Sequence, residues 1–314
     1  MRVIDAHFHW YPRPVLEELC ARLEIPFYLK SVWYDLDGQL EHMDRTGRDI
    51  DVIASAGIWS ERFCELPADA GEDLATAYNE AMAKAQKEHA GRMWTTAVVP
   101  LQDTDAAIRV LDHAITDLNL VGVALPSAVG AIGSGRKVDD PRLEPFYDRV
   151  EQLGVPLLLH PTDATFKPLL SGYEGALHGS LGRVVDLSVT AFRLVLSGIL
   201  QRHPAMKVFM SHTGGALPYQ AGRMDKNASI STLDGAPSAY LKRMYTDTVS
   251  PHSMGIEFAV EFYGPDQVCY GSDYPCWNPE AAFEVLDAAR LPDEVREAIY
   301  TSNARSFFGL AEEG

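Results

Sequence analysis

Two histidines lie two residues apart near the start of the chain, in the segment VIDAHFHW (residues 3–10). The segment begins with an apolar run typical of a buried β-strand, in which successive side chains point to opposite faces. His7 and His9 would therefore leave the same face together and aim at one point. Two imidazoles that converge in this way are typical metal ligands. The spacing predicts a metal site at the end of the first strand.

Eight short apolar segments predict the strands that would position such a site. They cover residues 2–8, 51–57, 93–100, 120–126, 155–160, 207–212, 244–249 and 267–273. Between them lie segments with helical spacing and charged faces, at residues 71–89, 104–118, 142–154, 187–204 and 292–309. Apolar strands separated by helices indicate a parallel sheet covered on both faces. The order predicts an α/β fold, a (β/α)8 TIM barrel, with an open doubly wound sheet as the alternative.

Neither a change of composition nor a low-complexity tract nor a linker divides the sequence, so we expect one domain over residues 1–314. The longest stretch that could be an insertion, at about residues 163–186, follows the fifth predicted strand. In a TIM barrel this stretch would lie on the catalytic face, where it could act as a lid.

The charge of the chain bears on its partners. A net charge of −17 and a pI near 4.9 argue against binding to nucleic acid or to an anionic membrane surface. An anionic substrate would have to be attracted by local cations instead of by the overall field. No apolar run approaches the roughly 20 residues of a membrane helix, and the N-terminus is strand-like, unlike a signal peptide. The four cysteines are too few and too irregularly spaced for a disulfide scaffold, so we expect a cytoplasmic protein with reduced thiols.

Polar residues follow several of the predicted strands. They are His7 and His9 on strand one, His160 on strand five, His212 on strand six and Asp273 on strand eight. The C-terminal ends of all strands of a TIM barrel converge on one face, so these five groups would lie close together at that face. A single histidine at a strand end is usually structural, but four of the ten histidines of the chain fall at such ends.

The motifs around these residues resemble those of a known family. DAHFH (5–9), LLLHPTD (157–163), SHTGG (211–215) and GSDYP (271–275) are similar to motifs of the metal-dependent amidohydrolase superfamily. Within it, the chain resembles the branch typified by α-amino-β-carboxymuconate-ε-semialdehyde decarboxylase. The resemblance runs essentially end to end, because it also includes VPLQD (99–103), LSGILQRHP (196–204), GRMD (222–225) and SNARSFFGL (302–310).

The resemblance implies a centre with one divalent metal ion and a water molecule. Its implied ligands are His7, His9, His160 and Asp273. It also implies that His212 activates the water, so we expect His212 and Asp273 to be catalytic. Imidazole and carboxylate ligands suit zinc, with manganese or iron as alternatives. The fourth predicted strand offers no lysine for a second metal ion, and Asp5 is expected outside the ligand set, in a supporting hydrogen-bonding role.

Three functions are compatible with this site. The first is a non-oxidative decarboxylase (carboxy-lyase) of an unsaturated or aromatic carboxylic acid, as in the branch that the chain resembles. The second is a metal-dependent hydrolase of a C–N, C–O or C–C bond, or a hydratase, that acts on a ring-cleavage or aromatic substrate. The third is a metal-stabilised barrel that binds a small molecule without turnover, which would predict a missing ligand or base, and neither is missing.

One departure from the resembled decarboxylase concerns the substrate. That enzyme has a longer segment between strands one and two, with an arginine for the substrate carboxylate, whereas residues 21–44 here are shorter and offer Lys30 as the nearest cation. Other cations lie in loops on the expected catalytic face: Arg62 after strand two, and Arg136 and Lys137 after strand four.

Aromatic residues are frequent in the same loops. They are Trp10, Tyr11, Trp33, Tyr34, Trp59, Phe63, Tyr274 and Trp277. Clefts for planar organic molecules are lined in this way, so we expect a flat, conjugated or aromatic carboxylate as the substrate. The expected substrate contacts are Arg62, Trp59, Trp10, Arg223 and His178. Arg223 resembles a residue that reaches the site of a neighbouring subunit, and we expect a homo-oligomer, most simply a dimer.

Overall fold

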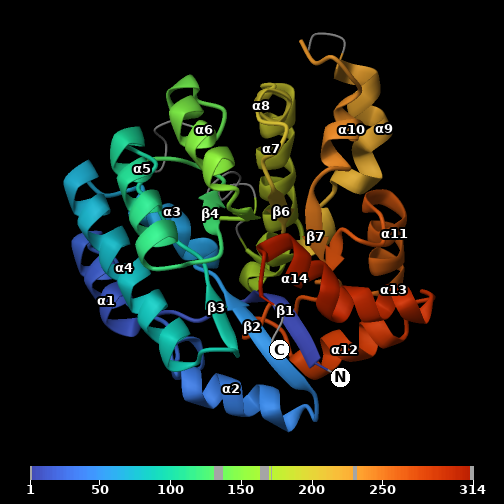
Figure 1. Ribbon diagram of the computed structural model, residues 1–314, viewed down its shortest axis with the longest axis horizontal. Helices are drawn as coiled ribbons and strands as arrows, with labels where there is room; N and C mark the ends of the chain where they lie inside the picture. The colour runs from blue at the N-terminus through green and yellow to red at the C-terminus, as the bar shows by residue number, and fades with distance from the viewer. Residues whose placement is uncertain (1, 131–136, 163–169, 171, 229–231, 312–314) are drawn as a thin grey trace.

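The structure is a computed structural model, and it describes residues 2–130, 137–162, 170, 172–228 and 232–311 (Figure 1). Arg136 and much of the candidate lid, residues 163–169 and 171, lie outside the described residues.

All the predicted strands form. They are β1 (Arg2–Phe8), β2 (Asp49–Ala54), β3 (Met93–Thr95), β4 (Val123–Pro126), β5 (Leu157–His160), β6 (Val208–Met210), β7 (Tyr245–Asp247) and β8 (Val268–Cys269). They pair in parallel and in chain order, as β1-β2-β3 and as β4 to β8. A parallel bridge between Ala97 and Val123 connects the two groups at one side, and a bridge between Phe8 and Tyr274 connects them at the other. The prediction of a (β/α)8 TIM barrel is confirmed.

Helices surround the strands on the outside (Figure 1). They are α1 (Arg13–Arg22), α2 (Leu36–Arg45), α3 (Ser60–Phe63), α4 (Ala68–Glu88), α5 (Thr104–Asp112), α6 (Glu144–Leu153), α7 (Arg183–Leu196), α8 (Ile199–Arg202), α9 (Leu217–Asn227), α10 (Pro237–Leu241), α11 (Ser253–Tyr263), α12 (Pro279–Asp287), α13 (Asp293–Glu297) and α14 (Asn303–Phe308). The helix predicted over 187–204 is two helices, because Gly198 adopts a left-handed conformation (φ 77°) between α7 and α8. Within the described residues, no helix is long and apolar enough to span a bilayer.

A separate apolar cluster fills one end of the barrel. It joins strand residues such as Ile4, Ile53, Leu158 and Phe209 to Phe307 of α14. This packing explains the continuous apolar runs in the sequence, because strands covered on both sides have few polar positions.

The first strand departs from simple alternation. Ile4 and Ala6 belong to the interior cluster, yet His7 and His9 come together in the metal-ligand group. The pairing of β1 with β2 shifts register between Asp5 and Phe8. A bulge of this kind re-aims side chains locally, and it turns His7 and His9 to the site.

Candidate metal centre

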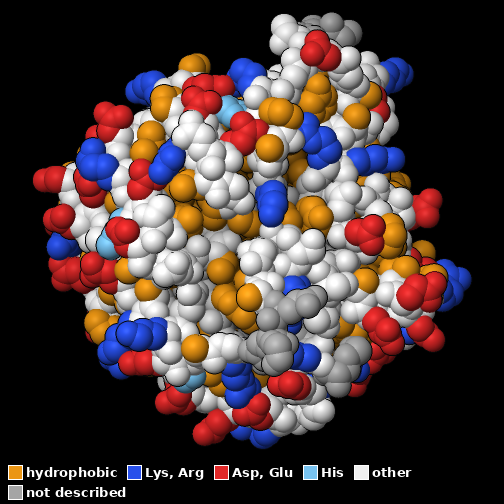
Figure 2. Space-filling model, in the orientation of Figure 1, with side chains coloured by type: hydrophobic (Ala, Val, Ile, Leu, Met, Phe, Trp, Pro, Cys, Tyr) orange, Lys and Arg blue, Asp and Glu red, His pale blue; other side chains and the backbone are white. Residues whose placement is uncertain are grey.

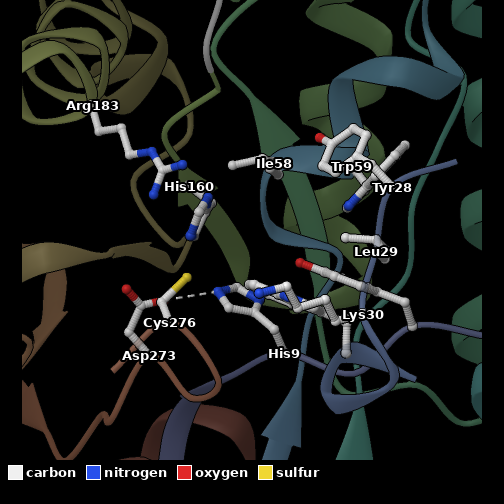
Figure 3. A pocket seen from close by; sticks show the side chains of 12 residues that line it. His9, Tyr28, Leu29, Lys30, Ile58, Trp59, His160, Arg183, Asp273 and Cys276 are labelled. Atoms are coloured by element: carbon white, nitrogen blue, oxygen red, sulfur yellow. Dashed lines mark hydrogen bonds and ion pairs between the residues drawn. The ribbon is translucent and has the colours of Figure 1, made fainter. Parts of the chain in front are cut away.

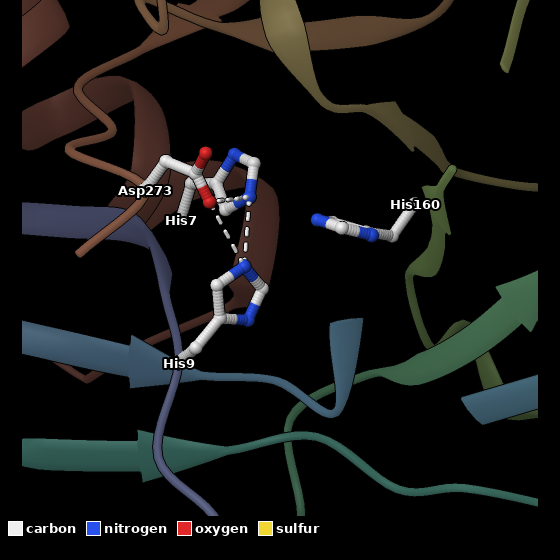
Figure 4. A group of neighbouring side chains, drawn as sticks. All are labelled: His7, His9, His160 and Asp273. Atoms are coloured by element: carbon white, nitrogen blue, oxygen red, sulfur yellow. Dashed lines mark hydrogen bonds and ion pairs between the residues drawn. The ribbon is translucent and has the colours of Figure 1, made fainter. Parts of the chain in front are cut away.

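Four side chains from three parts of the barrel converge at the C-terminal ends of the strands. They are His7, His9, His160 and Asp273, and one ligand atom of each lies within 4.8 Å of those of the others. Nε2 of His7 and Nε2 of His9 are 3.2 Å apart, and Oδ1 of Asp273 lies 3.1 Å from Nε2 of His9. Figure 4 shows these three side chains together, with His160 facing them from across the gap.

Hydrogen bonds at Nδ1 orient all three imidazoles. Nδ1 of His7 lies 2.6 Å from Oδ2 of Asp247, Nδ1 of His9 lies 3.2 Å from the carbonyl oxygen of Ser55, and Nδ1 of His160 lies 2.9 Å from that of Pro161. Carbonyl and carboxylate oxygens accept here, so each Nδ1 carries a hydrogen, and the lone pair of each neutral ring is at Nε2.

The resulting arrangement fits a cation. Nε2 of His160 is buried and has no hydrogen-bond partner among the described residues, and a buried polar atom left in this way is costly. Nε2 atoms of His7 and His9 also face each other and the Asp273 carboxylate at close range. A divalent metal ion would give all four groups a common partner, so the residues present fit such an ion.

The protonation states of the ligands also fit a bound divalent cation. Burial opposes a proton on His7, but Asp273 and Asp247 outweigh burial and raise the pKa of His7 to about 10. Burial, together with the neighbouring histidines, lowers the pKa of His160 well below its usual value. Burial opposes the charge of Asp273, yet the neighbouring histidines hold the pKa of this carboxyl well below its usual range. A divalent ion would take the place of the proton on His7, because metal ligands bind deprotonated.

Asp247, at the end of β7, supports the site although the sequence analysis did not single it out. Besides His7, it accepts hydrogen bonds at 3.0 Å from the backbone amides of His212, Thr213 and Val249. The carboxylate is fully buried, and so links the metal-ligand group to the turn that carries His212. In the sequence, the feature that indicates a role for Asp247 is its position as a polar residue within a predicted strand.

His212 lies beside the four ligands but is not one of the group. Its ring centroid is 5.1 Å from that of His7 and 5.5 Å from that of His160. Burial lowers the pKa of His212 to about 4, against the opposing charge of Asp273, so the ring is neutral near pH 7. Its Nε2 is buried and has no hydrogen-bond partner in the described structure. This atom is available to accept a proton.

The backbone of the site is strained. His212 (φ 54°), Thr213 (φ 52°) and Asp273 (φ 57°) all adopt left-handed conformations. Residues other than glycine rarely do so, and such strain clusters at functional sites. Glycine is also required nearby: a Cβ atom at Gly271 would lie 2.8 Å from Cβ of His7 and 2.9 Å from Cβ of Asp247. This contact explains the glycine of the GSDYP motif.

Asp5 has the supporting role expected of it. It accepts hydrogen bonds from the backbone amide of His7 at 3.1 Å and from the backbone amide of Ser272 at 3.0 Å. Burial raises the pKa of Asp5 to about 7, although these hydrogen bonds favour the charged form. Asp5 thereby ties β1 to the segment that carries Asp273.

An aromatic cavity of about 360 Å³ opens beside the ligands (Figure 3). Its walls include Tyr11, Tyr28, Trp33 and Trp59, and it reaches His9, His160 and Asp273. The rings of Tyr11 and Trp33 stack at 5.6 Å with an interplanar angle of 6°. Flat apolar walls next to a few polar groups suit a planar organic ligand.

A second cavity of about 460 Å³ also reaches Asp273. It is lined by His212, Thr213, Ser180 and Ser250, among others. Arg183 and Asp273 line both cavities. The two cavities thus share part of their wall, and residues of the metal-ligand group or His212 line each of them.

Comparison with protein families matches residues 4–310 to the amidohydrolase family. The chain belongs to this family. The resemblance seen in its motifs is thereby confirmed.

Relatives of the chain include named decarboxylases. The chain is 26% identical over 296 residues to 2-amino-3-carboxymuconate-6-semialdehyde decarboxylase of Dictyostelium discoideum. This match covers 90% of the chain and 79% of the relative. The chain is 28% identical over 251 residues to γ-resorcylate decarboxylase of Rhizobium sp., which covers 76% of each. Its fold is similar to a crystal structure of dihydroxybenzoic acid decarboxylase from Polaromonas sp. with bound manganese and an inhibitor (TM-score 0.85, 21% identity, 99% of this chain and 98% of that chain covered).

The predicted substrate contacts of the amidohydrolase fall in different places. Trp59 lines the aromatic cavity, and His178 directly precedes Gly179 and Ser180, which line the second cavity. Trp10 is half-buried and donates from Nε1 to the carbonyl oxygen of Tyr34 at 3.1 Å. It is not among the described residues that line either cavity.

The predicted cations are also dispersed. Lys30 lines the aromatic cavity. Arg62 instead pairs with Glu65 at 2.9 Å, Lys137 forms a bridge with Ala128, and Arg223 is exposed on α9. Their roles in substrate binding stay predictions. Arg183, the cation that lines both cavities, was missed, because it lies at the start of a helix more than twenty residues beyond His160, where spacing gives no signal.

Proposed function

We propose that this member of the amidohydrolase family is a mononuclear metal-dependent carboxy-lyase that removes CO2 without oxidation from an unsaturated or aromatic carboxylic acid. The observation that carries the proposal is the convergence of three oriented imidazoles and one carboxylate beside both a neutral His212 and an aromatic cavity. Two of its curated relatives, named as decarboxylases of small unsaturated or aromatic acids, support the reaction.

We propose zinc as the resident ion, held by His7, His9, His160 and Asp273. Three imidazole nitrogens and one carboxylate oxygen are a common zinc ligand set. Manganese is the alternative, because the Polaromonas structure contains it. When bound, the ion supplies a positive charge that orients and polarises the oxygen atoms of the substrate.

His212 is the proposed proton carrier. In this reaction the ring or vinyl carbon that bears the carboxylate gains a proton, the C–C bond to the carboxylate breaks, and its electron pair returns to the unsaturated system as CO2 leaves. Nε2 of His212 takes the required proton from water and passes it to that carbon. The charge of Asp273 raises the pKa of His212 against burial, so Asp273 stabilises the imidazolium during the transfer. Asp273 is in this sense both ligand and catalytic residue.

The aromatic cavity is the proposed binding site for the planar part of the substrate. Trp59 and the stacked pair of Tyr11 and Trp33 provide flat walls next to His9 and His160. Because these walls are apolar, they favour the uncharged ring, while oxygen atoms that stay on the substrate face the metal-ligand group.

The proposed state of the protein in the cell follows from its surface and thiols. Tyr219 on α9 and Met254 and Phe258 on α11 are exposed, and they accompany Arg223 on α9. We propose a homodimer that covers this surface.

The cytoplasm is the proposed location, since all four cysteines are free thiols. The net charge of −17 and the interspersed acidic and basic side chains on the face shown in Figure 2 argue against nucleic acid or an anionic membrane as partner. The proposed partner is a small carboxylate, attracted by cations of the site.

The test combines elemental analysis with a substrate screen. Purified protein is assayed for metal, and conjugated and aromatic acids are screened for both CO2 release and hydrolysis or hydration. About one zinc or manganese ion per chain with CO2 evolved supports the proposal. The same metal content with hydrolysis and no CO2 would assign the site to a hydrolase instead. A bound metal without turnover of any acid would favour a binding protein.

A further inference from the structure

Arg183 occupies a distinctive place in the site. It is the first residue of α7, and its half-buried side chain lies in the wall that the aromatic cavity and the second cavity share. Figure 3 shows it reaching from α7 toward His160, on the same side of the cavity as Asp273 and Cys276. Of the described Lys and Arg residues that line the two cavities, Lys30 is exposed and lines the aromatic cavity alone.

The charge of Arg183 reaches the catalytic groups. Burial is the main cause of the low pKa of His212, and the guanidinium of Arg183 lowers it further. Burial raises the pKa of the Cys276 thiol to about 12, while Arg183 acts in the opposite direction through its charge and a hydrogen bond. Arg183 lines one cavity with His160 and Asp273 and the other with His212, so its guanidinium can contact a substrate held in either space.

The chemistry of decarboxylation decides which anion suits this position. The carboxylate that leaves as CO2 loses its charge during the reaction, so an arginine bound to it would stabilise the reactant more than the transition state. An anionic group that stays on the substrate keeps its charge throughout, and binding it costs nothing in the rate of the chemical step. An arginine in this position is thus suited to an anionic group that remains on the product.

We propose that Arg183 binds a second acidic group of the substrate, so that the substrate is an unsaturated or aromatic acid with two anionic groups, of which one leaves as CO2. The inference rests on the proposed function and narrows its substrate class. The guanidinium can contact a carboxylate through two parallel hydrogen bonds, which fixes the orientation of the ring as well as its position. With a net charge of −17, the protein also needs such a local cation to attract a dianion.

Direct binding provides the first test, with benzene-1,3-dicarboxylate and benzoate as probes. Their affinities are measured by calorimetry on the metal-loaded wild type and on Arg183→Met and Arg183→Lys. Wild type is expected to bind the dicarboxylate about 10- to 100-fold more tightly than benzoate, the range of a charge-assisted hydrogen-bonded pair. Arg183→Met should lose this preference, and Arg183→Lys should keep part of it, because lysine retains the charge without the planar fork.

The matched control is Arg193→Met on the same helix. Arg193 pairs with Asp139 at 2.7 Å and is not among the described residues that line either cavity. Arg193→Met should leave the preference for the dicarboxylate over benzoate unchanged. Metal content and melting temperature of each variant show whether a change in affinity reflects binding or a loss of structure.

Kinetics provides the second test once an acid that releases CO2 is known. For a substrate with two acidic groups, Arg183→Met should raise KM with little change in kcat, because the contact is equal in the ground and transition states. A wild type that binds both probes equally, or a preference that survives Arg183→Met, would overturn the inference. Failure to release CO2 from any acid would overturn the proposed function. The binding data would still show whether Arg183 binds a second acidic group.

Discussion

Replacing Asp247 with asparagine tests how the metal-ligand group is oriented. Oδ2 of Asp247 accepts from Nδ1 of His7 and from the amide of His212, and Oδ1 accepts from the amides of Thr213 and Val249. In Asp247→Asn one oxygen can still serve Thr213 and Val249, but an NH2 group then faces His7 and His212. His7 must shift its hydrogen to Nε2 to accept this donor, and it then no longer offers a lone pair to a metal ion.

The magnitude follows from these contacts. Loss of such an outer hydrogen bond to a ligating histidine typically weakens metal binding by about 10- to 100-fold. The amide of His212, left facing a donor, adds about 1–3 kcal/mol of destabilisation. We therefore expect weaker metal affinity together with a moderate loss of stability, and a displaced His212 that lowers turnover beyond the loss of metal.

The assay is a competitive metal titration with a chromogenic chelator, accompanied by urea unfolding of the metal-free protein. Asp51→Asn is the matched control, because Asp51 is also buried and pairs with Arg2 at 2.5 Å, outside the metal-ligand group. It should lose stability and keep wild-type metal affinity. Unchanged metal affinity in Asp247→Asn would refute the account of how His7 is oriented.

Three further predictions concern single groups. His212→Ala should lower turnover by about 10²- to 10⁴-fold while elemental analysis still finds about one metal ion per chain, and loss of the metal would make His212 a ligand instead. Burial raises the pKa of Glu61 from 4.5 to about 7, so its contribution to stability is complete at low pH and is lost as the pH rises through 7. Urea unfolding should show Glu61→Gln more stable than wild type at pH 8 by about 3 kcal/mol, with little difference at pH 4; a constant difference across this range would disprove the assignment. Because the pKa of His7 is about 10, metal binding at pH 8 should release about one proton, which calorimetry in buffers of different ionisation enthalpy measures; no release would mean that His7 is neutral before the ion binds.

Much of the barrel could be predicted from the sequence, because periodicity and apolar runs report burial directly. Five of the observed strands, β2, β3, β6, β7 and β8, end before the predicted residue, whereas β1, β4 and β5 end where predicted. The segment predicted as a strand over 207–212 ends at Met210, since His212 turns into a left-handed conformation that propensity does not indicate for histidine. The departure is functional, because this turn places His212 beside the metal-ligand group.

The group of His7, His9, His160 and Asp273 was predictable because parallel strands bring their C-terminal ends together. The bulge in β1 was not, since a strict alternation from Ile4 would have sent His7 outward. Arg183 was not predictable either, because its position depends on how a helix starts after a long loop. Asp247 was predictable, because a carboxylate near the end of an apolar predicted strand lies at the same face of the barrel as the ligands.

The most direct test of the central claim is anomalous diffraction from a crystal of the protein, recorded on both sides of the zinc or manganese absorption edge. The account predicts one anomalous peak per chain, bounded by Nε2 of His7, His9 and His160 and by the carboxylate of Asp273. A peak that His212 also ligates would change the assignment of the proton carrier. A peak elsewhere in the barrel, or none in a crystal of active enzyme, would contradict the claim that these four residues hold the metal ion.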